Sequence, residues 1–523
     1  MARLVVISNR VPAPADRLAH AGGLAVALRK VLQRSGGLWF GWSGQVVETP
    51  VAEPVAATVG GITFATLDLS AEDYAAYYET YANSILWPLC HYRLGLIEFR
   101  RAAFQGYQRV NALFANALAK LIRPDDVIWV HDYHLIPMAA ALRKAGIRNR
   151  IGFFLHIPFP AKEVFSALPD AVALAKALLH YDLVGLQTQD DVGALLGYLA
   201  GEIRADIAKD GVVSASGLRT RVGAFPIGID TEPFAAAARA AATSPEAIRL
   251  RESLGGRALV IGVDRLDYSK GLPRKVEAFS QLLEQRPEHR SRVTFMQISP
   301  ASRETVPQYR TLRRELDAAA GRVNGRFAEF DWMPVRYLNR SFSRRTLAGF
   351  YRAARVGFVA PLRDGMNLVA KEYVAAQDPA DPGVLILSRF AGAARELSSA
   401  LIVNPFDIDA LADALHRAIT MPLDERQGRW EAMIEPLRRN TVEDWADRFL
   451  RTLAEDGAPV DTRQPGRARI GWSRHSAGAG DIGLRRTVAA TLSSVAVAED
   501  SLEKHTTVDG ETHSRRIIGL VGD

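Results

Sequence analysis

The sequence has 523 residues, 48% of them hydrophobic, so it can bury more than one core, and we expect at least two domains. Its net charge of +7, from 65 basic and 58 acidic residues, comes without the clustered basic runs of a nucleic-acid binder and suits small phosphorylated substrates better. The single cysteine, Cys90, excludes an internal disulfide, and no apolar run approaches the ~20 residues that span a bilayer. The N-terminal stretch has an apolar core too short for a signal peptide. We therefore expect a soluble, cytoplasmic protein that binds neither nucleic acid nor membrane.

Short runs rich in Val, Ile and Leu recur between amphipathic helical stretches. The first series is RLVVIS (3–8), DVIWV (126–130), IGFFL (151–155) and LVGLQ (183–187). The second series is ALVIG (258–262), VTFMQIS (293–299), VGFVA (356–360), VLILS (384–388) and LIVNP (401–405). Runs that are apolar on both faces and separated by helices are typical of parallel sheets covered on both sides. The fold class is therefore α/β and doubly wound.

In open parallel sheets, ligands bind at the carboxyl ends of the strands, so polar residues there are the first candidates. The first run ends in Asn9 and Arg10, and a helix opened by Gly22 and Gly23 follows. A glycine pair at a helix N-terminus lets backbone N–H groups approach a phosphate closely. A flexible turn is the alternative interpretation of these two glycines.

Histidines follow two further runs of the first series. His131, Asp132 and His134 come after DVIWV, and His156 comes after IGFFL, before a turn that contains proline. Two histidines and an aspartate could suggest a metal site, but no further His, Cys or Glu group has supporting ligand spacing, so we predict no metal. A histidine that caps the turn is the structural alternative for His131 and His134. Asp132 and His156 are expected nearest the centre of a cleft.

An Ala-rich polar stretch, AAAARAAATSPEAIRLRESLGG (235–256), separates the two series of strands. We place a domain boundary near residue 235, which gives an N-terminal domain (1–235) and a C-terminal domain (236–456). After residue 456 the chain is rich in Gly, Arg, Ser and Pro and has neither a strand nor a helix period. We expect residues 457–523 to form a mostly disordered tail, whose later part could be a marginal helix.

Two cations follow the first run of the second series. Arg265 and Lys270 lie five residues apart on one strand-to-helix loop, and only ten of the 65 basic residues are lysines, so a lysine there is less expected. This spacing matches a diphosphate, with arginine as a planar two-pronged donor and lysine as a point charge. A surface ion pair between Arg265 and Asp267 is the alternative.

The run VGFVA is followed by Asp364 and Gly365, and then by a helix whose first turns contain Asn367, Lys371 and Glu372. A carboxylate one turn inside that helix can accept two sugar hydroxyls, and amides at the helix start can hold a diphosphate. A capped helix with an exposed glutamate is the alternative.

The segment FDIDAL (406–411) resembles the two-aspartate opening of haloacid-dehalogenase-type phosphatases. It follows the run LIVNP and leads directly into the helix ALADALHRAI, and no phosphatase partner domain follows. We therefore reject a phosphatase and expect Asp409 to be a helix N-cap.

Several long motifs in order show that the sequence resembles the trehalose-6-phosphate synthases, retaining glycosyltransferases with two Rossmann-like domains that face a central cleft (GT-B). The resemblance runs from residue 3 to about 450, and the tail lies outside it. It is carried by SNR, AGGLAV, WFGWSG, ILWPLCHYR, WVHDYHLIP, IGFFLHIPFP, FPIGID, RLDYSKGLP, the SR at 302 and 303, and PLRDGMNLVAKEYVAAQ.

The resemblance implies a role for individual residues of this sequence. The implied contacts to the donor nucleotide sugar are Gly22, Gly23, Arg265, Lys270, Phe342, Asp364, Leu368, Val369 and Glu372. The implied contacts to the acceptor are Arg10, Tyr78, Trp87, Asp132 and Arg303. His156 would touch the donor glucose. The implied catalytic group is Asp132, His156, Arg265, Lys270 and Asp364.

The same resemblance implies transfer of glucose from a nucleoside diphosphate glucose, UDP-glucose or its GDP or ADP counterpart, to glucose 6-phosphate, giving trehalose 6-phosphate with retention. Arg265, Lys270 and helix-start amides can stabilise the leaving diphosphate, so we expect no metal and no cofactor. No pair of carboxylates with glycosidase roles stands out, which suits front-face retention. Domain closure would exclude water. We also expect a homo-oligomer, a dimer or a tetramer.

Three alternatives stay open at this point. A synthase of the same family could use glycerol 3-phosphate and make a glucosylglycerol phosphate. A nucleotide-sugar epimerase could use the same architecture, because a fold does not fix a reaction. A catalytically silent sensor could bind the sugar phosphate and a partner protein, although the intact set of polar residues argues against it.

Overall fold

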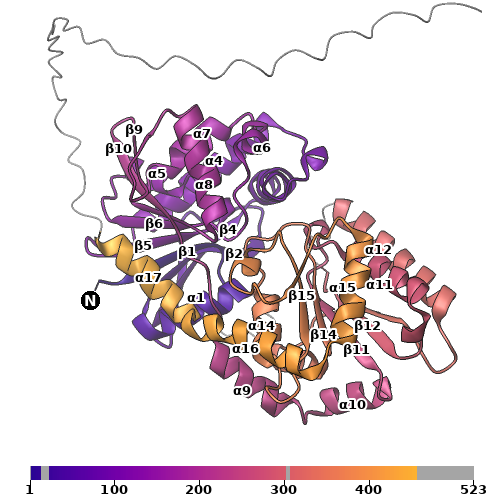
Figure 1. The fold of residues 1–523 in the computed structure, drawn as a ribbon. Coiled ribbons are helices and arrows are strands. Elements are labelled where there is room, and N and C mark those ends of the chain that lie inside the picture. Colours follow the sequence, from indigo (N-terminus) through magenta and orange to yellow (C-terminus); the bar gives the residue numbers. More distant parts are fainter. Residues whose placement is uncertain (1, 13–22, 302–306, 456–523) are drawn as a thin grey trace, which may run out of the picture. The chain divides into compact units, whose positions relative to one another are not determined.

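A computed structural model describes residues 2–12, 23–301 and 307–455. The chain divides into two compact units, Met1–Arg463 and Gln464–Asp523, and every described residue belongs to the first. That unit is α/β and contains two sheets with parallel cores (Figure 1), which confirms the predicted fold class. The tail predicted at 457–523 lies outside the described residues.

The first sheet has ten strands in the order β3-β4-β2-β1-β5-β6-β7-β10-β9-β8. All neighbours from β4 to β10 are parallel, whereas β3, β9 and β8 pair antiparallel at the two edges. The strands are β1 (Leu4–Arg10), β2 (Gly37–Val46), β3 (Val55–Val59), β4 (Ile62–Leu69), β5 (Val127–His131), β6 (Arg150–Phe154), β7 (Leu183–Leu186), β8 (Asp206–Ile207), β9 (Val212–Ala215) and β10 (Leu218–Ala224).

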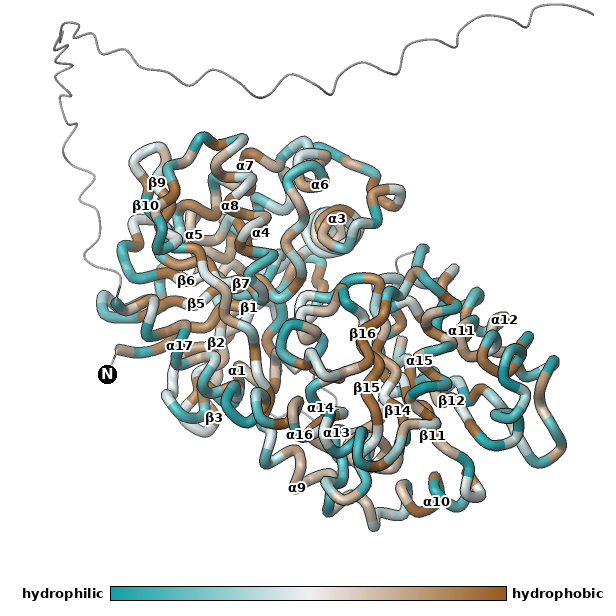
Figure 2. Tube along the Cα trace, viewed as in Figure 1, coloured by the Kyte–Doolittle hydropathy of each residue, from teal (hydrophilic) through white to brown (hydrophobic). Residues whose placement is uncertain are grey.

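The second sheet has six parallel strands in the order β13-β12-β11-β14-β15-β16, the strand order of a Rossmann fold. Figure 2 shows hydrophobic residues concentrated along β15 and β16. The strands are β11 (Ala258–Val263), β12 (Val293–Ile298), β13 (Val335–Leu338), β14 (Val356–Val359), β15 (Val384–Ser388) and β16 (Leu401–Val403).

Helices connect the parallel strands. Those up to β10 are α1 (Gly23–Ser35), α2 (Ala71–Asp73), η2 (Tyr74–Leu86), α3 (Trp87–Cys90), η3 (Leu94–Leu96), α4 (Arg101–Ala119), η4 (Tyr133–Leu135), α5 (Met138–Lys144), α6 (Lys162–Ser166), α7 (Ala171–Leu178) and α8 (Gln189–Glu202). The later ones are α9 (Thr231–Ala241), α10 (Pro245–Leu254), η5 (Tyr268–Lys270), α11 (Leu272–Gln285), η6 (Pro287–His289), α12 (Pro307–Phe327), α13 (Arg344–Ala353), α14 (Leu368–Ala376), η7 (Gly392–Arg395), α15 (Ile408–Thr420), α16 (Leu423–Arg439) and α17 (Val442–Glu455).

Every predicted strand run coincides with a strand. The runs are apolar throughout because both faces of each sheet are covered: in β1, Val5 and Ile7 pack in one buried cluster while Leu4 and Val6 pack in another. The search for continuous apolar runs missed β4, in which buried and half-buried residues mix, and the more polar β10. It also missed β2, β3, β8, β9 and β13.

The last described helix, α17, belongs in space to the first sheet. It follows α16 in the chain yet packs on β6 and β7, as Figure 1 shows for the yellow end of the ribbon. A Cβ added at Gly152 or at Gly185 would overlap the ring of Phe449, so the two glycines let α17 lie directly on the sheet. The predicted division at residue 235 stays a prediction.

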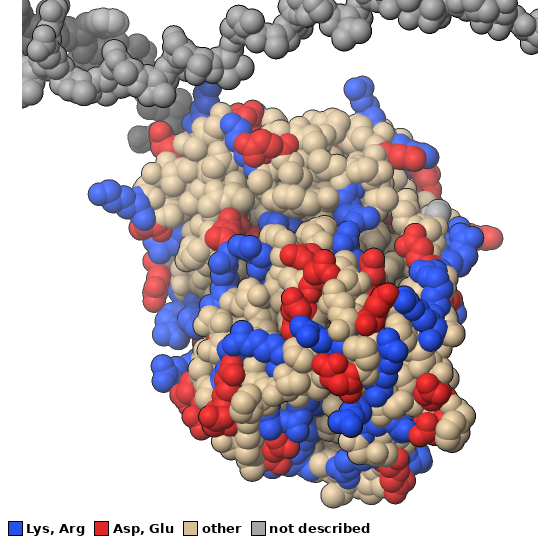
Figure 3. All heavy atoms as spheres, turned by 45° about the vertical axis from the view of Figure 1, so that its right-hand side comes forward, with Lys and Arg blue, Asp and Glu red and all other residues tan. Residues whose placement is uncertain are grey.

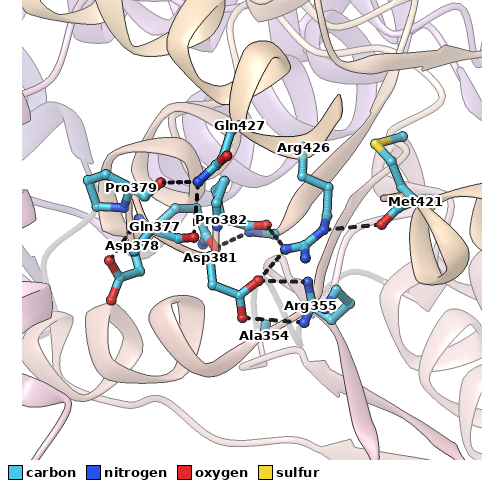
Figure 4. Close-up of polar contacts among 12 residues, drawn as sticks. Ala354, Arg355, Gln377, Asp378, Pro379, Asp381, Pro382, Met421, Arg426 and Gln427 are labelled. Atoms are coloured by element: carbon cyan, nitrogen blue, oxygen red, sulfur yellow. Dashed lines mark hydrogen bonds and ion pairs between the residues drawn. The ribbon is translucent and has the colours of Figure 1, made fainter. Parts of the chain in front are cut away.

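The amino-end edge of the second sheet is held by the guanidinium of Arg426 on α16 (Figure 4). It donates from Nη1 to Asp381 Oδ1 and to Pro382 O, both at 2.5 Å, and from Nε to Met421 O at 3.2 Å. Arg355, which precedes β14, donates to the same carboxylate. These bonds hold the loop between α14 and β15 in place. They therefore also fix the C-terminal end of α14, the helix that begins at the carboxyl edge of the sheet.

Candidate active site

The strand order of the second sheet defines a switch point between β11 and β14, where the chain leaves to opposite sides and where ligands bind in such sheets. The loop after β11 carries Arg265 and Lys270, and the loop after β14 carries Asp364. Gly271 ends the first loop with φ of +64°, and a Cβ there would lie 2.9 Å from Ala360 O. Glycine therefore allows the two loops to approach each other.

Lys270 and Asp364 link these two loops. Lys270 Nζ lies 2.5 Å from Asp364 Oδ2, and Asn367 Nδ2 donates to the same oxygen at 3.0 Å. Burial would raise the pKa of Asp364, but the Lys270 ammonium outweighs it and lowers that pKa. The pair is therefore an ionised carboxylate that orients a buried ammonium at the end of β11.

The helix that opens this edge, α14, begins at a strained residue. Asn367 has φ of +76°, and its side chain caps the helix by accepting from Ala370 N at 3.1 Å. The half-buried Leu368 and Val369 form the first turn. Glu372, one turn on, accepts from Arg344 Nε at 3.2 Å, and burial raises its pKa despite that cation. Glu372 is therefore not the exposed glutamate of the alternative interpretation.

Arg265 is exposed and reaches toward the first sheet. Its guanidinium carbon lies 5.6 Å from the ring centre of the buried Trp87, which the sequence placed on the acceptor side. The alternative of an ion pair with Asp267 does not hold among the described residues, since the Asp267 carboxylate is buried and accepts from Ser269 N and from Tyr309 Oη. Arg265 is thus free to face a ligand.

The first sheet contributes Asp132, directly after β5. Its backbone has φ of +77° and ψ of 165°, a conformation that costs a residue other than glycine about 1–3 kcal/mol. Asp132 Oδ1 accepts from His156 N at 3.2 Å, and Asp132 N donates to Phe154 O at 2.8 Å. These bonds hold the strained aspartate against the loop that follows β6.

The histidines of this edge do not converge on a metal. His131 Nδ1 lies 3.1 Å from His156 Nε2, whereas the ring of His134 stacks on Tyr78 at 5.8 Å. Burial lowers the pKa of His156 to about 3. The residue before η4 is Asp132, so neither His131 nor His134 caps that turn.

The loop after β14 in the second sheet touches the loop after β6 in the first sheet at Gly365. A Cβ on Gly365 would overlap His156 O, and one on Gly392 would overlap Gly365 O. No larger residue fits at Gly365 unless the loops separate. This contact brings the Asp364 loop of the second sheet next to His156 of the first.

The remaining acceptor candidates lie around the start of η2, a π-helix. Arg10 is exposed at the end of β1, and its neighbour Asn9 accepts from Tyr77 Oη at 2.8 Å. Tyr78, half buried, stacks on Tyr74 at 5.4 Å. The aromatic residues at the start of η2 therefore form a stack of rings beside the end of β1.

Some predicted site residues are only partly described. Gly22 and Arg303 lie outside the described residues, and Gly23 is the first residue of α1. Phe342 is half buried, packs on Phe350 at 5.5 Å and lies under the guanidinium of Arg340 at 4.6 Å.

Arg344, the partner of Glu372, was not predicted from the sequence, because a single arginine carries no signal in a chain this rich in arginine.

One prediction near the second sheet is wrong. The N-cap of α15 is Asp407, whose side chain accepts from Ala410 N at 2.9 Å, not Asp409. Asp409 lies in the first turn and accepts from Gln281 Nε2 at 2.7 Å. The capping aspartate comes before the first helical residue, and the helix starts two residues earlier than an N-cap at Asp409 requires.

Among the described residues, one group of side chains is close enough to hold a metal ion, namely Glu288, His289 and His416. His289 ends η6 and His416 lies late in α15, so the group belongs to the amino-end edge of the second sheet. It takes no part in the site at the carboxyl edge.

On the face that Figure 3 shows, Lys and Arg alternate with Asp and Glu, and no patch of one sign stands out. Within residues 2–12, 23–301 and 307–455, no helix is long and apolar enough to cross a membrane.

Comparisons with known proteins agree over nearly the whole described chain. The model of glycosyltransferase family 20 matches residues 3–455. The trehalose-6-phosphate synthase of Sinorhizobium fredii is 52% identical over 457 residues, which cover 87% of this chain and 98% of the relative. The trehalose-6-phosphate synthase of Cronobacter sakazakii is 48% identical over 469 residues, which cover 89% of this chain and 97% of the relative.

Solved structures share the fold. The UDP-forming alpha,alpha-trehalose-phosphate synthase of Burkholderia vietnamiensis has a TM-score of 0.84 and 49% identity, with 87% of this chain and 99% of that chain covered. The Burkholderia xenovorans enzyme in complex with glucose-6-phosphate gives 0.84 and 49%, with 87% and 100% covered. An Escherichia coli structure bound with UDP-2-fluoro glucose gives 0.82 and 46%, with 87% and 99% covered.

The α/β fold with two sheets and the match to a glycosyltransferase family over residues 3–455 define the class of protein: this protein is a glycosyltransferase. The chain belongs to glycosyltransferase family 20.

Proposed function

We propose that this chain transfers glucose from UDP-glucose to glucose 6-phosphate with retention and releases α,α-trehalose 6-phosphate and UDP. The relatives that bind glucose-6-phosphate and UDP-2-fluoro glucose support both substrates. The observation that carries the proposal in this chain is the partly buried Lys270–Asp364 pair at the switch point, with Arg265 exposed on the same loop as Lys270. Soluble metabolites of this kind suit a cytoplasmic enzyme, and we expect a homo-oligomer.

The donor side would consist of the second sheet. In this proposal Arg265 and Lys270 balance the charge that grows on the diphosphate as its bond to the glucose C1 breaks. Asp364 keeps the ammonium in place, and the amides at the start of α14 face the same region. Phe342, Leu368, Val369 and Glu372 would hold the nucleoside and its ribose, and Gly22 and Gly23 would approach the donor from the first sheet.

The acceptor side would consist of the first sheet. Arg10, Tyr78, Trp87 and Arg303 would bind glucose 6-phosphate, and Asp132 would orient it. The acceptor hydroxyl attacks C1 on the face that the diphosphate leaves, and its proton passes to the leaving phosphate oxygen, so atoms and charge balance without a protein nucleophile. The strain at Asp132 is consistent with a carboxylate held ready for a ligand.

Product identification tests the proposal. Purified protein is incubated with UDP-, GDP- or ADP-glucose and with glucose 6-phosphate or glycerol 3-phosphate, and the products are identified by mass spectrometry and NMR. We expect trehalose 6-phosphate from UDP-glucose and glucose 6-phosphate. A glucosylglycerol phosphate as the main product would contradict the acceptor, a new sugar nucleotide from donor alone would indicate an epimerase, and no turnover with any pair would indicate a sensor.

A further inference from the structure

The end of β5 holds a histidine that the proposed reaction does not use. His131 is fully buried, and its Nδ1 lies 3.1 Å from Nε2 of His156, the residue expected to touch the donor glucose. Burial lowers the pKa of both rings, so each is neutral near neutral pH and carries one hydrogen. In a bond between two neutral imidazoles, one nitrogen must donate and the other must accept.

Two arrangements satisfy that bond. In the first, His131 Nδ1 donates, His131 Nε2 is a bare acceptor, and the hydrogen of His156 is on its Nδ1. In the second, His156 Nε2 donates, His131 carries its hydrogen on Nε2, and His156 Nδ1 is a bare acceptor. The first arrangement buries a bare His131 Nε2 and leaves an N–H on His156 Nδ1. The second buries an N–H on His131 Nε2 and leaves His156 Nδ1 bare.

The surroundings of His131 favour the first arrangement. His131 Nε2 is buried and has no hydrogen-bond partner among the described residues. The rings of Trp129 and Trp445 lie 4.5 and 6.3 Å from the His131 ring, and their Nε1 atoms are also buried and without a partner in the same part of the chain. An indole can only donate. An N–H on His131 Nε2 would therefore add a third orphan donor, whereas a bare Nε2 offers the indoles an acceptor that a buried water can bridge.

We propose that His131 is a positioning residue that donates from Nδ1 to His156 Nε2 and thereby fixes His156 in the tautomer with its hydrogen on Nδ1. His156 is only partly buried, and its Nδ1 makes no hydrogen bond to any described residue. An N–H at that atom donates to a hydroxyl oxygen of the transferred sugar. The identity of that sugar rests on the proposed function, but the tautomer does not.

The backbone supports this geometry from two sides. Asp132 Oδ1 accepts from His156 N, and Phe154 O accepts from Asp132 N, so Asp132, which follows His131, is bonded both to the last residue of β6 and to His156 itself. His131 and Phe154 are themselves paired in the strand register. The ring of His156 also lies 6.0 Å from that of Trp445 on α17. The His131–His156 bond therefore joins the last residue of β5 to a loop residue whose backbone N–H is held by Asp132.

Nitrogen-15 NMR of the full-length protein labelled in its histidines tests the tautomer directly. The signals of His131 and His156 are assigned by their loss in His131→Asn and His156→Gln variants. We expect both residues to show a protonated Nδ1 and a bare Nε2. A protonated Nε2 on either residue in the wild type would overturn the proposal, whether or not the protein transfers glucose.

Two matched variants test the consequence for catalysis. His131→Asn keeps an N–H donor near the position of Nδ1, whereas His131→Phe keeps the ring and loses the donor. We expect His131→Phe to mix the tautomers of His156 and to lower kcat about 10-fold with the acceptor KM and Tm nearly unchanged. His131→Asn should stay within about 3-fold of the wild type. Unchanged His156 signals and unchanged kcat in a folded His131→Phe protein would overturn the proposal.

Discussion

At the scale of single residues, the loops after β11 and β14 are joined through the bond from Lys270 to Asp364. Because we propose that Lys270 balances charge that appears only as the donor bond breaks, Lys270→Ala should lower kcat by roughly 100- to 1000-fold. The KM for glucose 6-phosphate should change little. Steady-state kinetics at saturating donor measures both values, and Arg274→Ala, a change at a half-buried arginine of the next helix, α11, serves as the control. Near-normal turnover of Lys270→Ala would remove Lys270 from the proposed site.

Arg303 tests the acceptor side. If its guanidinium bonds the acceptor, Arg303→Ala loses a charged hydrogen bond of about 1.5–3 kcal/mol, and the apparent affinity for glucose 6-phosphate should fall roughly 10- to 150-fold. The measurement is the acceptor KM at saturating donor. An unchanged acceptor KM with a raised donor KM would assign Arg303 to the donor instead.

Residue-level prediction from the sequence succeeded where a side chain follows a strand end. Lys270, Asp364, Asp132 and His156 all lie at the carboxyl edges of their sheets, because that position follows from the parallel topology alone. The positive φ of Asp132 could not be predicted, since it results from bonds to β6, which is distant in sequence. The pairing of Glu372 with Arg344 is likewise a tertiary contact.

At the scale of elements, Gly365 fixes how closely the β14 loop approaches the loop after β6. A methyl group at this position has no space beside His156 O. Gly365→Ala should therefore push the loops apart and lower kcat/KM by at least about 100-fold, because a displacement of ~1 Å can cost that much. Gly321→Ala on α12, where a Cβ meets nothing within 4 Å, is the matched control. Activity and Tm of both variants equal to the wild type would refute the close contact.

The hydrogen bonds of Arg426 are expected to stabilise the folded protein. Arg426→Ala removes bonds to two backbone oxygens and to Asp381, and the unpaired acceptors should lower the free energy of unfolding by about 1–3 kcal/mol in a urea titration. Arg355→Ala, which loses only exposed bonds to Asp381, should cost less. A larger loss in Arg355→Ala would show that Arg426 does not hold this loop.

The pH dependence of this network has a definite sign. The bond from Arg426 lowers the pKa of Asp381, so its contribution is present in full above the unfolded pKa of about 3.9 and is lost as the pH falls through the lowered value. Urea titrations of the wild type and of Asp381→Asn across that range measure it. The difference between the two proteins should shrink toward low pH, and a difference that grows would contradict the pairing.

Among the elements, most strands buried on both faces were predictable from composition, although β2, with five buried residues in a row, was missed. The residues of β4 alternate in burial, and β10 carries two arginines, so neither forms a continuous apolar run. The position of α17 depends on space left by Gly152 and Gly185, which lie far away in the sequence. The start of α15 was misplaced because FDID offers two aspartates, and only Asp407 precedes the helix.

At the scale of the whole molecule, the family match ends at residue 455, where the described residues also end. Since residues 457–523 carry no family motif, a protein truncated after Asp456 should keep kcat and both KM values within about 2-fold, well inside the range of a neutral change. The untruncated protein, purified in parallel, is the control. Loss of soluble, active protein on truncation would show that the tail contributes to folding or catalysis.

We propose that both sugars are held across the two sheets so that the new bond forms on the face that the diphosphate leaves. Proton NMR of the wild type turning over UDP-glucose and glucose 6-phosphate follows the anomeric proton of the transferred glucose in real time. We expect the first product to carry this glucose in the α configuration and UDP to appear in equal amount. A first product in the β configuration, or release of free glucose in place of the disaccharide, would contradict it.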